Sequence, residues 1–423
     1  MNKNIIKKFM SLFIITFVVI VSTQVVFSQQ NQLPHHSTNL NKEPKAWTAL
    51  YYIDADTSNP WWNIFVNIDI LENKFIHELA SDDNLNVLVL QDRRRDPACI
   101  YYIDEHHNKI PLQELGEVNL GDPQTLSDFI NYGKQQYPSE RYQLCLWGHA
   151  NAWYGVCPDD SSKGDALTID EFQQALSYNN AVDLICFLGC CQMASLESVY
   201  ELRDVCDVYV ASEATGNGND WYGIIDNMCR LLNNEGNLST IEIGNRIVNL
   251  IGKNPNEFYD SLTISAIRTD KIQNLTRSID ALSIKLLGEY NESVTLCKSS
   301  INQSKKFYFI QNSYLLDIYD FVDQYLQIEN DQAIRLVLTD IAMNLSEAII
   351  AERHGSKQNG SHGLSIFYSS KGFISTYKNY GLDFTDDTHW DEFLDEYKQK
   401  QSSLASFLLN KSLIESFLPV FNV

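Results

Sequence analysis

The sequence predicts an α/β fold in which helices cover both faces of a mostly parallel sheet, followed by a helix-rich C-terminal region. Up to about residue 288, short apolar runs alternate with stretches of helical periodicity. The runs are apolar throughout, which is typical of strands buried on both faces, and their alternation with helices indicates a parallel sheet. With 423 residues, 44% of them hydrophobic, the chain can bury a large core.

The expected elements follow in chain order. Strands are expected at residues 46–54, 85–92, 142–149, 183–190, 207–214 and 262–268, with a small hairpin made by 99–104 and the segment near Ile110. Helices are expected at residues 61–80, 125–136, 167–177 and 193–202, in the stretch up to 253, and on to 287. Thr168 and Asp170 can cap the helix that starts near residue 167. After residue 290 the pattern is helical, apart from a strand-like stretch at 363–368.

The first 28 residues have the pattern of a secretory signal peptide. Lys3, Lys7 and Lys8 precede an apolar stretch over residues 9–26, and Ser28 offers a small residue before the cleavage point. The alternative is a retained N-terminal anchor helix, because the apolar run approaches the length that spans a bilayer. Cleavage would leave a protein of the periplasm, the cell envelope or the medium that begins with a polar leader at residues 29–45.

Charge and cysteine content exclude several kinds of function. The net charge is −22, and it becomes −25 when residues 1–28 are removed, so the protein repels phosphate backbones and a nucleic-acid partner is not expected. The odd number of cysteines, nine, leaves at least one thiol outside any disulfide. The sequence has no CxxC pair with zinc-finger spacing and no histidine cluster, which argues against a zinc centre. Adjacent Cys190 and Cys191 also lack the spacing of a disulfide-exchange motif.

Polar residues follow several of the predicted strands. In open parallel sheets, ligands bind beyond the carboxyl ends of the strands. This rule draws attention to the polar residues that follow those ends, which are Asp54, Asp56, His149, Cys191, Ser212 and Glu213.

His149 and the pair Cys190-Cys191 end two successive strands, 42 residues apart for His149 and Cys191. If those strands are neighbours, an imidazole and a thiol emerge at one rim of the sheet. That arrangement produces a nucleophile, because the thiolate is the reactive form of cysteine and a nearby imidazole stabilises it. A helix starting at Met193 would favour the thiolate through its N-terminal partial charge and offer amides to an oxyanion.

Several segments resemble one peptidase family. They are GDPQTL at 121–126, LCLWGHANAW at 144–153, LTIDEFQQAL at 167–176, DLICFLGCCQMASLESVYEL at 183–202, VASEATGNG at 210–218, DIYDF at 317–321, HGLSIFY at 362–368 and HWDEFLDEY at 389–397. Together they are similar to the clostripain family of cysteine peptidases, which belongs to the clan of caspases, gingipains and legumains. The resemblance covers nearly the whole chain after residue 45. It implies a caspase-like fold and a secreted cysteine endopeptidase that hydrolyses peptides or proteins.

Carried over by position, the resemblance makes His149 the catalytic histidine and Cys191 the nucleophile. Alignment from the helix side selects Cys191, whereas alignment from the strand side selects Cys190, and we prefer Cys191. The amides of Ala150 and Cys191 would form the oxyanion hole. The family usually has glycine where this chain has Ala150, so a positive φ there would be strained.

The resemblance also identifies residues for substrate binding. The acidic residue that the family places two positions before the nucleophile is Gly189 here, which leaves preference for a basic P1 residue open. Glu213, Asp220, Asp54 or Asp56 are the candidate replacements, since a buried guanidinium needs a partner charge. Each of these acids, taken singly, also fits a solvated loop position. Trp221 and Tyr222 can form a wall of the pocket, or equally be core aromatics.

The polar segment at residues 155–166 lies between the histidine strand and the next helix. In the family, a cut in this region often activates the enzyme, and Lys163-Gly164 is the candidate autocleavage site. The segment is equally compatible with an ordinary exposed loop. Some relatives require calcium, and Asp159 and Asp160 are candidate ligands, although Ca²⁺ takes six to eight oxygens. We otherwise expect no cofactor.

These expectations combine into one hypothesis and one rival. The hypothesis is a signal peptide at 1–28, a leader at 29–45, a peptidase domain at 46–288 and a helix-rich region at 289–423 packed on it, acting as a Cys-His endopeptidase. We expect a monomer, or a two-chain form made by self-processing. The rival is a binding or scaffold protein that keeps the fold without activity, because fold does not imply function.

Overall fold

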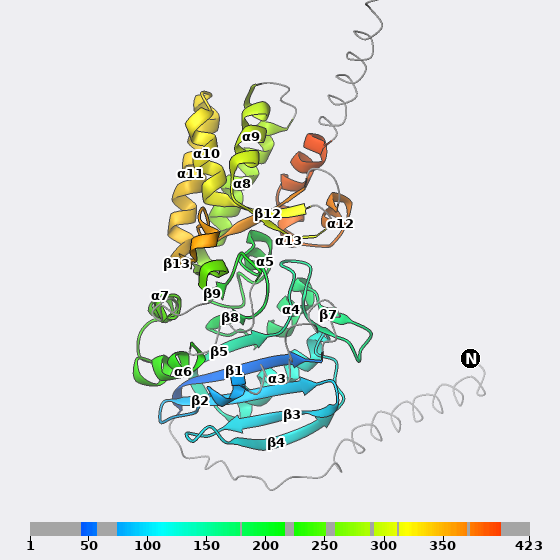
Figure 1. Ribbon diagram of the computed structural model, residues 1–423, viewed down its shortest axis with the longest axis vertical. Coiled ribbons are helices and arrows are strands. Elements are labelled where there is room, and N and C mark those ends of the chain that lie inside the picture. Colours follow the sequence, from blue (N-terminus) through cyan, green and yellow to red (C-terminus); the bar gives the residue numbers. More distant parts are fainter. Residues whose placement is uncertain are drawn as a thin grey trace, which may run out of the picture. The chain divides into compact units, whose positions relative to one another are not determined.

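A computed structural model describes residues 44–56, 74–177, 180–215, 224–250, 259–287, 292–310, 313–369 and 373–398. Its main feature is a nine-stranded sheet with the order β13-β10-β9-β8-β5-β1-β2-β3-β4 (Figure 1). The strands are β1 (Lys45–Ala55), β2 (Leu85–Arg93), β3 (Asp96–Ile103), β4 (Lys109–Gly116), β5 (Ser139–Trp147), β8 (Leu184–Leu188), β9 (Val208–Ala211), β10 (Thr263–Arg268) and β13 (Ile349–His354).

The five central strands are parallel. β1 pairs with β2 on one side and with β5 on the other, β5 pairs with β8, and β8 with β9. The strands at both edges are antiparallel, because β3 and β4 form the expected hairpin and β10 and β13 return beside β9. The chain moves from β1 to one neighbour and comes back as β5 on the other side. The carboxyl ends of β1 and β5 therefore mark the point at which the strand order reverses, where α/β proteins bind ligands.

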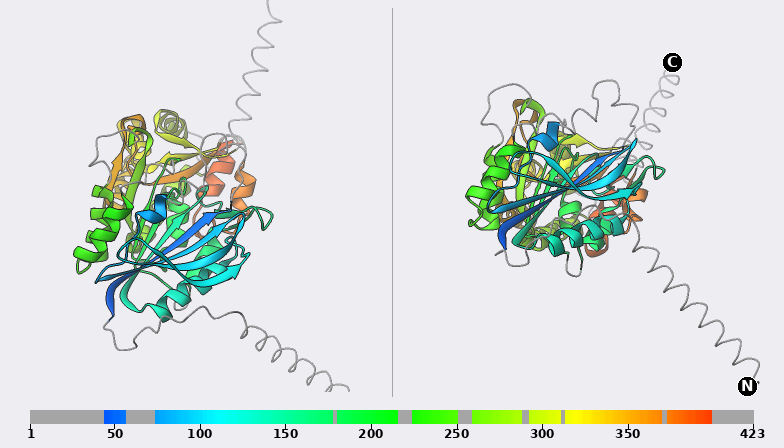
Figure 2. Two further views of the ribbon diagram at one scale, coloured as in Figure 1. Left: turned by 60° about the horizontal axis from the view of Figure 1, so that its bottom comes forward. Right: turned by 90° about the horizontal axis from the view of Figure 1, so that it is seen from below.

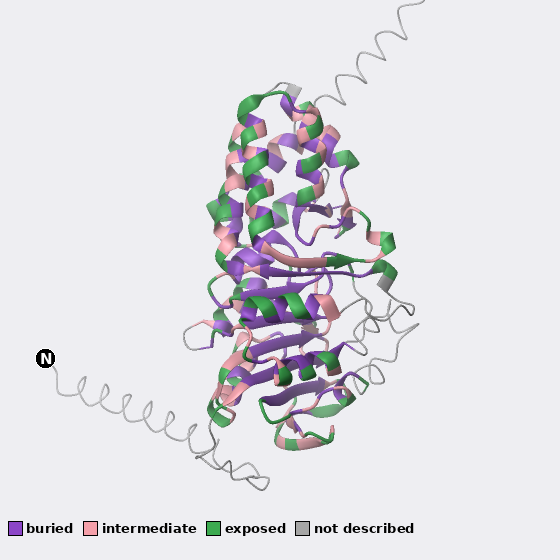
Figure 3. Ribbon diagram, turned by 90° about the vertical axis from the view of Figure 1, so that its left-hand side faces the viewer, coloured by how far each residue is buried: buried purple, intermediate pink, exposed green. Residues whose placement is uncertain are grey.

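Helices cover both faces of this sheet, as predicted. Alternate residues along each strand enter two separate apolar clusters, one with Leu144 and Leu146 and the other with Cys145 and Trp147. The first cluster packs against α3 (Pro123–Gln136), α4 (Ile169–Leu176), α5 (Leu196–Glu201) and α8 (Ile272–Leu286). The second packs against α6 (Ile225–Asn234) and α7 (Thr240–Leu250). Figure 2 shows α3, in teal, and α6 and α7, in green, on opposite sides of the strands, and Figure 3 shows the central strands as almost wholly buried.

The C-terminal region is helical but contains more strands than the sequence predicts. Its helices are α9 (Glu292–Gln303), α10 (Ile318–Ile328), α11 (Gln332–Ala348), α12 (Ile374–Lys378) and α13 (Asp383–Asp387). β11 (Lys306–Tyr308), β12 (Ser313–Asp317) and β14 (Ser365–Ser369) form a second sheet in the order β11-β12-β14. Only β14 was expected. β13, which follows α11, adds an edge strand to the main sheet, so this region is joined to the core by backbone hydrogen bonds.

Several predicted boundaries need correction. The helix predicted from Met193 begins at Leu196, with Ser195 as its N-cap. The helix predicted from residue 167 begins at Ile169, where Thr168 caps it in a capping box with Glu171. The predicted helix over 61–80 lies mostly outside the described residues, as do the signal peptide and nearly all of the leader. Among the described residues, no helix has the length and apolar character needed to cross a membrane.

Candidate active site

The sheet brings the predicted histidine and cysteine to the same rim. β5 and β8 are parallel neighbours, with Trp147 opposite Leu188 at their last paired position. His149 lies two residues beyond the end of β5, and Cys191 lies three residues beyond the end of β8. Because parallel strands end on one side of a sheet, the loops that carry the imidazole and the thiol leave the sheet together.

Backbone hydrogen bonds connect these loops. The Ala152 amide donates to the Cys191 carbonyl at 3.5 Å, and the Cys157 amide donates to the His149 carbonyl at 2.9 Å. The residues after the cysteine are bound to the segment that follows β9, because Gln192 donates to the Ala214 carbonyl at 3.1 Å and Ala194 to that of Ser212 at 2.9 Å. The histidine loop, the cysteine loop and the loop after β9 therefore form one connected rim.

The two adjacent cysteines occupy different environments. Cys190 is 2% exposed and belongs to the apolar cluster on the α3 face, where its sulfur contacts the Leu146 carbonyl at 3.7 Å. Burial raises the pKa of its thiol well above the usual value, which disfavours the thiolate. Cys191 is 9% exposed and belongs to neither apolar cluster. Of the two, Cys191 lies at the margin of the core and Cys190 inside it.

The helix after the cysteines does not lie where its dipole could act on Cys191 as predicted. α5 starts five residues beyond Cys191 and is six residues long. One amide of its first turn is already engaged, because the Ser198 amide donates to the Ser195 hydroxyl at 3.3 Å. The effect of a helix N-terminus falls off within the first turn. The expectation that this helix stabilises a thiolate at Cys191 is therefore wrong.

His149 is half-buried, and the charge of Asp160, which the sequence suggested only as a calcium ligand, acts on it. Burial lowers the pKa of the imidazole, and the charge of Asp160 acts in the opposite direction. Asp160 is held by its amide, which donates to the Asp56 carbonyl at 2.9 Å. The lowered pKa favours a neutral imidazole at pH 7, the form that accepts a proton from a thiol.

Gly148 fits a crowded position between β5 and His149. A Cβ at this position would lie 3.0 Å from the Cβ of Asp54 and 3.1 Å from its Oδ2 atom. Ala150, which replaces the family's usual glycine, is not among the described residues with positive φ, whereas Ala152 is, at +48°. The bridge between Ala150 and Val156 is made through the His149 carbonyl and the Asn151 amide. Alanine at position 150 therefore introduces no strain of the kind that was expected.

Gly189 has a left-handed backbone, with φ of +82°. A Cβ built there would lie 3.5 Å from Cδ1 and Nε1 of Trp147, which is ordinary van der Waals contact. The position therefore has room for a side chain but a backbone that favours glycine, and in this chain it supplies no carboxylate.

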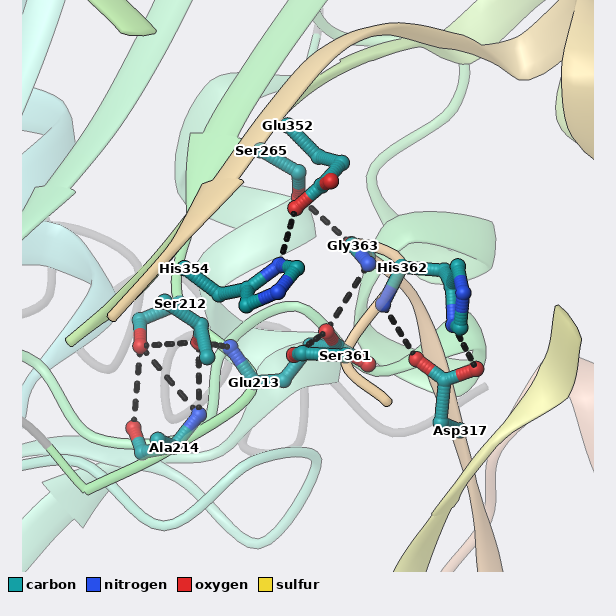
Figure 4. Close-up of polar contacts among 11 residues, drawn as sticks. Ser212, Glu213, Ala214, Ser265, Asp317, Glu352, His354, Ser361, His362 and Gly363 are labelled. Atoms are coloured by element: carbon teal, nitrogen blue, oxygen red, sulfur yellow. Dashed lines mark hydrogen bonds and ion pairs between the residues drawn. The ribbon is translucent and has the colours of Figure 1, made fainter. Parts of the chain in front are cut away.

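Glu213, a predicted substrate-binding residue, is instead part of an internal network (Figure 4). Its side chain is fully buried, and its Oε2 atom accepts hydrogen bonds from the Ser361 hydroxyl at 2.6 Å and the Gly363 amide at 2.8 Å. Burial, and then the charge of Asp317, raise its pKa well above the usual range. Glu213 binds the segment before β14 to the end of β9, so we do not retain it as a specificity residue. Asp220, Trp221 and Tyr222 lie outside the described residues.

The segment with the predicted cut site is a hairpin. β6 (Val156–Asp159) and β7 (Asp165–Leu167) pair antiparallel, and Lys163 and Gly164 lie exposed in the turn between them. The Gly164 amide donates to the Asp159 carbonyl at 2.7 Å, which closes the turn. An exposed turn of this kind is accessible to a protease.

Acids gather at the ends of β1 and β2. Carboxylate oxygens of Asp56, Asp92, Glu117 and Asp159 all lie within 4.8 Å of one another. Asp54 adjoins this group and is fully buried, so neither it nor Asp56 is open to a substrate side chain. Burial, followed by the charges of Glu117 and Asp159, raises the pKa of Asp92 to about 7. Asp160 is not part of the group. Asp92 ends a predicted strand, and the strand-end rule would have found it.

Comparison with known proteins agrees with this geometry. A model of the clostripain family matches residues 51–397, which is most of the chain. The chain belongs to the clostripain family. It is accordingly a cysteine-type peptidase, a hydrolase that acts on peptide substrates. Clostripain from Hathewaya histolytica is 26% identical over an alignment 407 residues long, and the match covers 78% of this chain and 76% of that protein.

Two solved structures share the fold of this clostripain-family chain. An inactive zymogen of a C11 protease from Parabacteroides distasonis aligns with a TM-score of 0.60 and 19% identity, covering 82% of this chain and 99% of its own. A secreted C11 cysteine protease from Bacteroides thetaiotaomicron, in complex with an irreversible peptide inhibitor, aligns with a TM-score of 0.58 and 17% identity, covering 81% and 98%. The predicted caspase-like architecture is confirmed by these matches.

Proposed function

We propose that this clostripain-family peptidase is an exported endopeptidase in which Cys191 is the nucleophile and His149 its acid–base partner. The observation that carries the proposal is the parallel pairing of β5 with β8, which places both loops at one rim, joined by the hydrogen bond from Ala152 to Cys191. Cys191 rather than Cys190 is chosen because Cys190 is buried in the apolar cluster, where a charged thiolate is disfavoured.

The reaction follows from these positions. His149 takes the proton of the Cys191 thiol, and the thiolate attacks the carbonyl carbon of the scissile peptide. The amides of Ala150 and Cys191 stabilise the oxyanion of the tetrahedral intermediate. The intermediate collapses to a thioester as His149 gives its proton to the leaving amine. Water, deprotonated by His149, then attacks the thioester, releases the acid product and restores the thiol.

Export and activation by internal cleavage are part of the proposal. The basic and apolar N-terminal segment supports export, as does the description of the Bacteroides relative as secreted. The exposed turn at Lys163-Gly164 supports cleavage in the hairpin that follows His149. A cut there would free the chain ends next to the loop that carries the histidine, so that the rim can adjust around a substrate.

The nucleophile is tested by comparing Cys191→Ala with the matched variant Cys190→Ala. Each purified variant is incubated with a mixed peptide library, and turnover is followed by mass spectrometry. Loss of the nucleophile is expected to lower kcat by a factor on the order of 10⁴ or more, whereas Cys190→Ala should retain turnover and lose only some core packing. A thiol-directed peptidyl probe should label wild type and Cys190→Ala but not Cys191→Ala.

The same experiment distinguishes the rival reading. If no cysteine is labelled selectively and no peptide is cleaved, the chain is a scaffold that keeps the family's fold. If Cys190→Ala loses both turnover and labelling while Cys191→Ala keeps them, Cys190 is the nucleophile. Blocking the turn with Lys163→Ala tests processing, since it should leave a single chain on a denaturing gel where the wild type shows two.

A further inference from the structure

Gln192, the residue that follows the proposed nucleophile, is fixed both by its backbone and by its side chain. The residue is 2% exposed. Its backbone amide donates to the Ala214 carbonyl at 3.1 Å, in the loop after β9. Its side-chain amide donates to the Tyr308 carbonyl at 2.7 Å, 116 residues later in the chain and at the end of β11. The cysteine loop is therefore bound both to the rim of the main sheet and to the small sheet of the C-terminal region.

The backbone of Gln192 is left-handed, with φ of +62°. Residues other than glycine rarely adopt this conformation, and it persists only where the surrounding structure fixes it. Among the described residues, six that are not glycine have positive φ. Three of these, Ala152, Cys157 and Gln192, donate their amides to the hydrogen bonds that connect the histidine loop, the cysteine loop and the loop after β9. Backbone strain is therefore concentrated at the rim, as is common where a structure holds reacting groups in place.

The end of β11 also contacts the segment that carries the histidine. Phe309, the residue after Tyr308, is 6% exposed, and its ring centroid lies 5.4 Å from that of Trp153. Trp153 is fully buried and follows His149 by four residues. Two adjacent residues of the C-terminal region thus support both loops. The Tyr308 carbonyl binds the cysteine side through Gln192, and the Phe309 ring packs against the histidine side.

We propose that Gln192 is a positioning residue for the nucleophile, and that its hydrogen bond to β11 holds the Cys191 thiol where His149 can take its proton. This inference rests on the function proposed above for Cys191 and His149. Gln192 acts through the backbone of Cys191, the residue before it, rather than on the substrate. Proton transfer requires heavy atoms within about 2.6–3.2 Å, so a small displacement of the loop interrupts it. A misplacement of about 1 Å can lower a rate on the order of 10²-fold.

The test replaces Gln192 with methionine, which has a similar length and fills the same space but has no donor for the Tyr308 carbonyl. With a peptide that the wild type cleaves, kcat of Gln192→Met should fall on the order of 10²-fold, while KM changes by less than about twofold. The second measurement is the pH dependence of Cys191 alkylation by iodoacetamide, followed by tandem mass spectrometry. Wild-type Cys191 should react well below pH 8.5, about the pKa of an ordinary thiol, because the imidazole takes its proton. In Gln192→Met the alkylation curve should move toward that value.

Two further variants separate positioning from packing. Gln143→Met is the matched control, because Gln143 is also a buried glutamine, but its side-chain amide lies inside the sheet, 3.3 Å from the Cys186 sulfur. It should lower the thermal unfolding midpoint and leave kcat within about twofold of wild type and the alkylation curve in place. Gln192→Asn retains an amide and tolerates the left-handed backbone, but it is one methylene too short to reach Tyr308. It should lose kcat as Gln192→Met does, and it decides the matter if the methionine variant fails to fold.

The outcomes distinguish this inference from the function on which it rests. Wild-type kcat and an unmoved alkylation curve in Gln192→Met or Gln192→Asn would overturn the positioning role and leave Cys191 as the nucleophile. Equal losses in Gln143→Met would also overturn it, because the effect would then be one of general packing. If the wild type neither cleaves peptides nor reacts selectively at Cys191, the proposed function fails, and the positioning role fails with it.

Discussion

A buried glutamate in α5 makes the stability of this protein depend on pH in an unusual direction. Glu197 is 0% exposed, and its Oε1 atom accepts hydrogen bonds from the Phe367 amide at 2.8 Å and the Tyr377 hydroxyl at 3.0 Å. Its Oε2 atom has no partner. Burial raises the pKa of this carboxyl to about 7, against the two hydrogen bonds, which lower it. The folded protein therefore holds this proton more tightly than the unfolded chain does.

The size of the effect follows from the two pKa values. With a pKa of about 7 in the folded state and 4.5 in the unfolded state, the proton on Glu197 favours folding fully below pH 4.5. This contribution is lost as the pH rises through 7. Linkage gives a contribution on the order of 3 kcal/mol at pH 5 and almost none at pH 8. Acidification from pH 8 to pH 5 should therefore add about 2–3 kcal/mol through this residue alone.

The assay compares the free energy of unfolding of wild type and Glu197→Gln by urea denaturation between pH 5 and 8. Glutamine keeps the shape and the acceptor but cannot titrate, so the advantage of wild type over the variant should grow by about 2–3 kcal/mol toward pH 5. Tyr377→Phe is the matched control, because it keeps the ring and deletes the hydrogen bond that lowers the pKa of Glu197. Its pH profile should move to higher pH. Parallel profiles for wild type and Glu197→Gln would refute the reasoning.

Two further predictions concern the rim. Asp160→Asn removes a charge that raises the pKa of His149, so this pKa should fall further, which NMR titration of the His149 ring checks. Because the neutral imidazole is the form that takes the thiol proton, the acidic limb of the kcat/KM profile should move to lower pH, which kinetics checks. Gly189→Asp introduces a carboxylate at the position where the family usually has an acid, and its Cβ would lie 3.5 Å from Trp147, so it fits. The variant should raise the preference for arginine over alanine at P1 at least about tenfold. The left-handed backbone at this position should lower the stability by about 1 kcal/mol. An unchanged P1 profile would show that position 189 does not line the specificity pocket.

The central sheet could be predicted because its strands carry their own signal. Segments such as Leu184–Leu188 are apolar on both faces and short, and helices with regular periodicity separate them. β13 was missed because Ile349–His354 ends in charged residues, and its burial is only partial at the sheet's edge. Its place is set by pairing with β10, a long-range contact that no local pattern encodes.

The site was predictable where strand ends determine it and not where loops do. The rule on strand ends found His149 and Cys191, and the structure places both at one rim. The start of α5 was predicted three residues too early, because the apolar residues Met193 and Ala194 continue the helical pattern. In the structure the Met193 carbonyl accepts from the Tyr209 hydroxyl, and the Ala194 amide donates to the Ser212 carbonyl in the loop after β9. The sequence predicts a substrate-binding role for Glu213 because it cannot show that the residue is buried. The burial depends on Ser361 and Gly363, which lie about 150 residues later in the chain.

Asp54 connects the two chemical regions of this rim. It is the last residue but one of β1, the strand that lies between β5 and β2. Its side chain packs against Gly148, the residue before the proposed catalytic histidine, His149. Burial raises the pKa of Asp54, and the charges of Asp159, Asp92 and Asp56 raise it further. Burial and these like charges together favour the protonated form of Asp54. Gly148, which packs against Asp54, directly precedes His149 in the chain, so the ionisation of Asp54 acts on the electrostatic field at the base of the His149 loop.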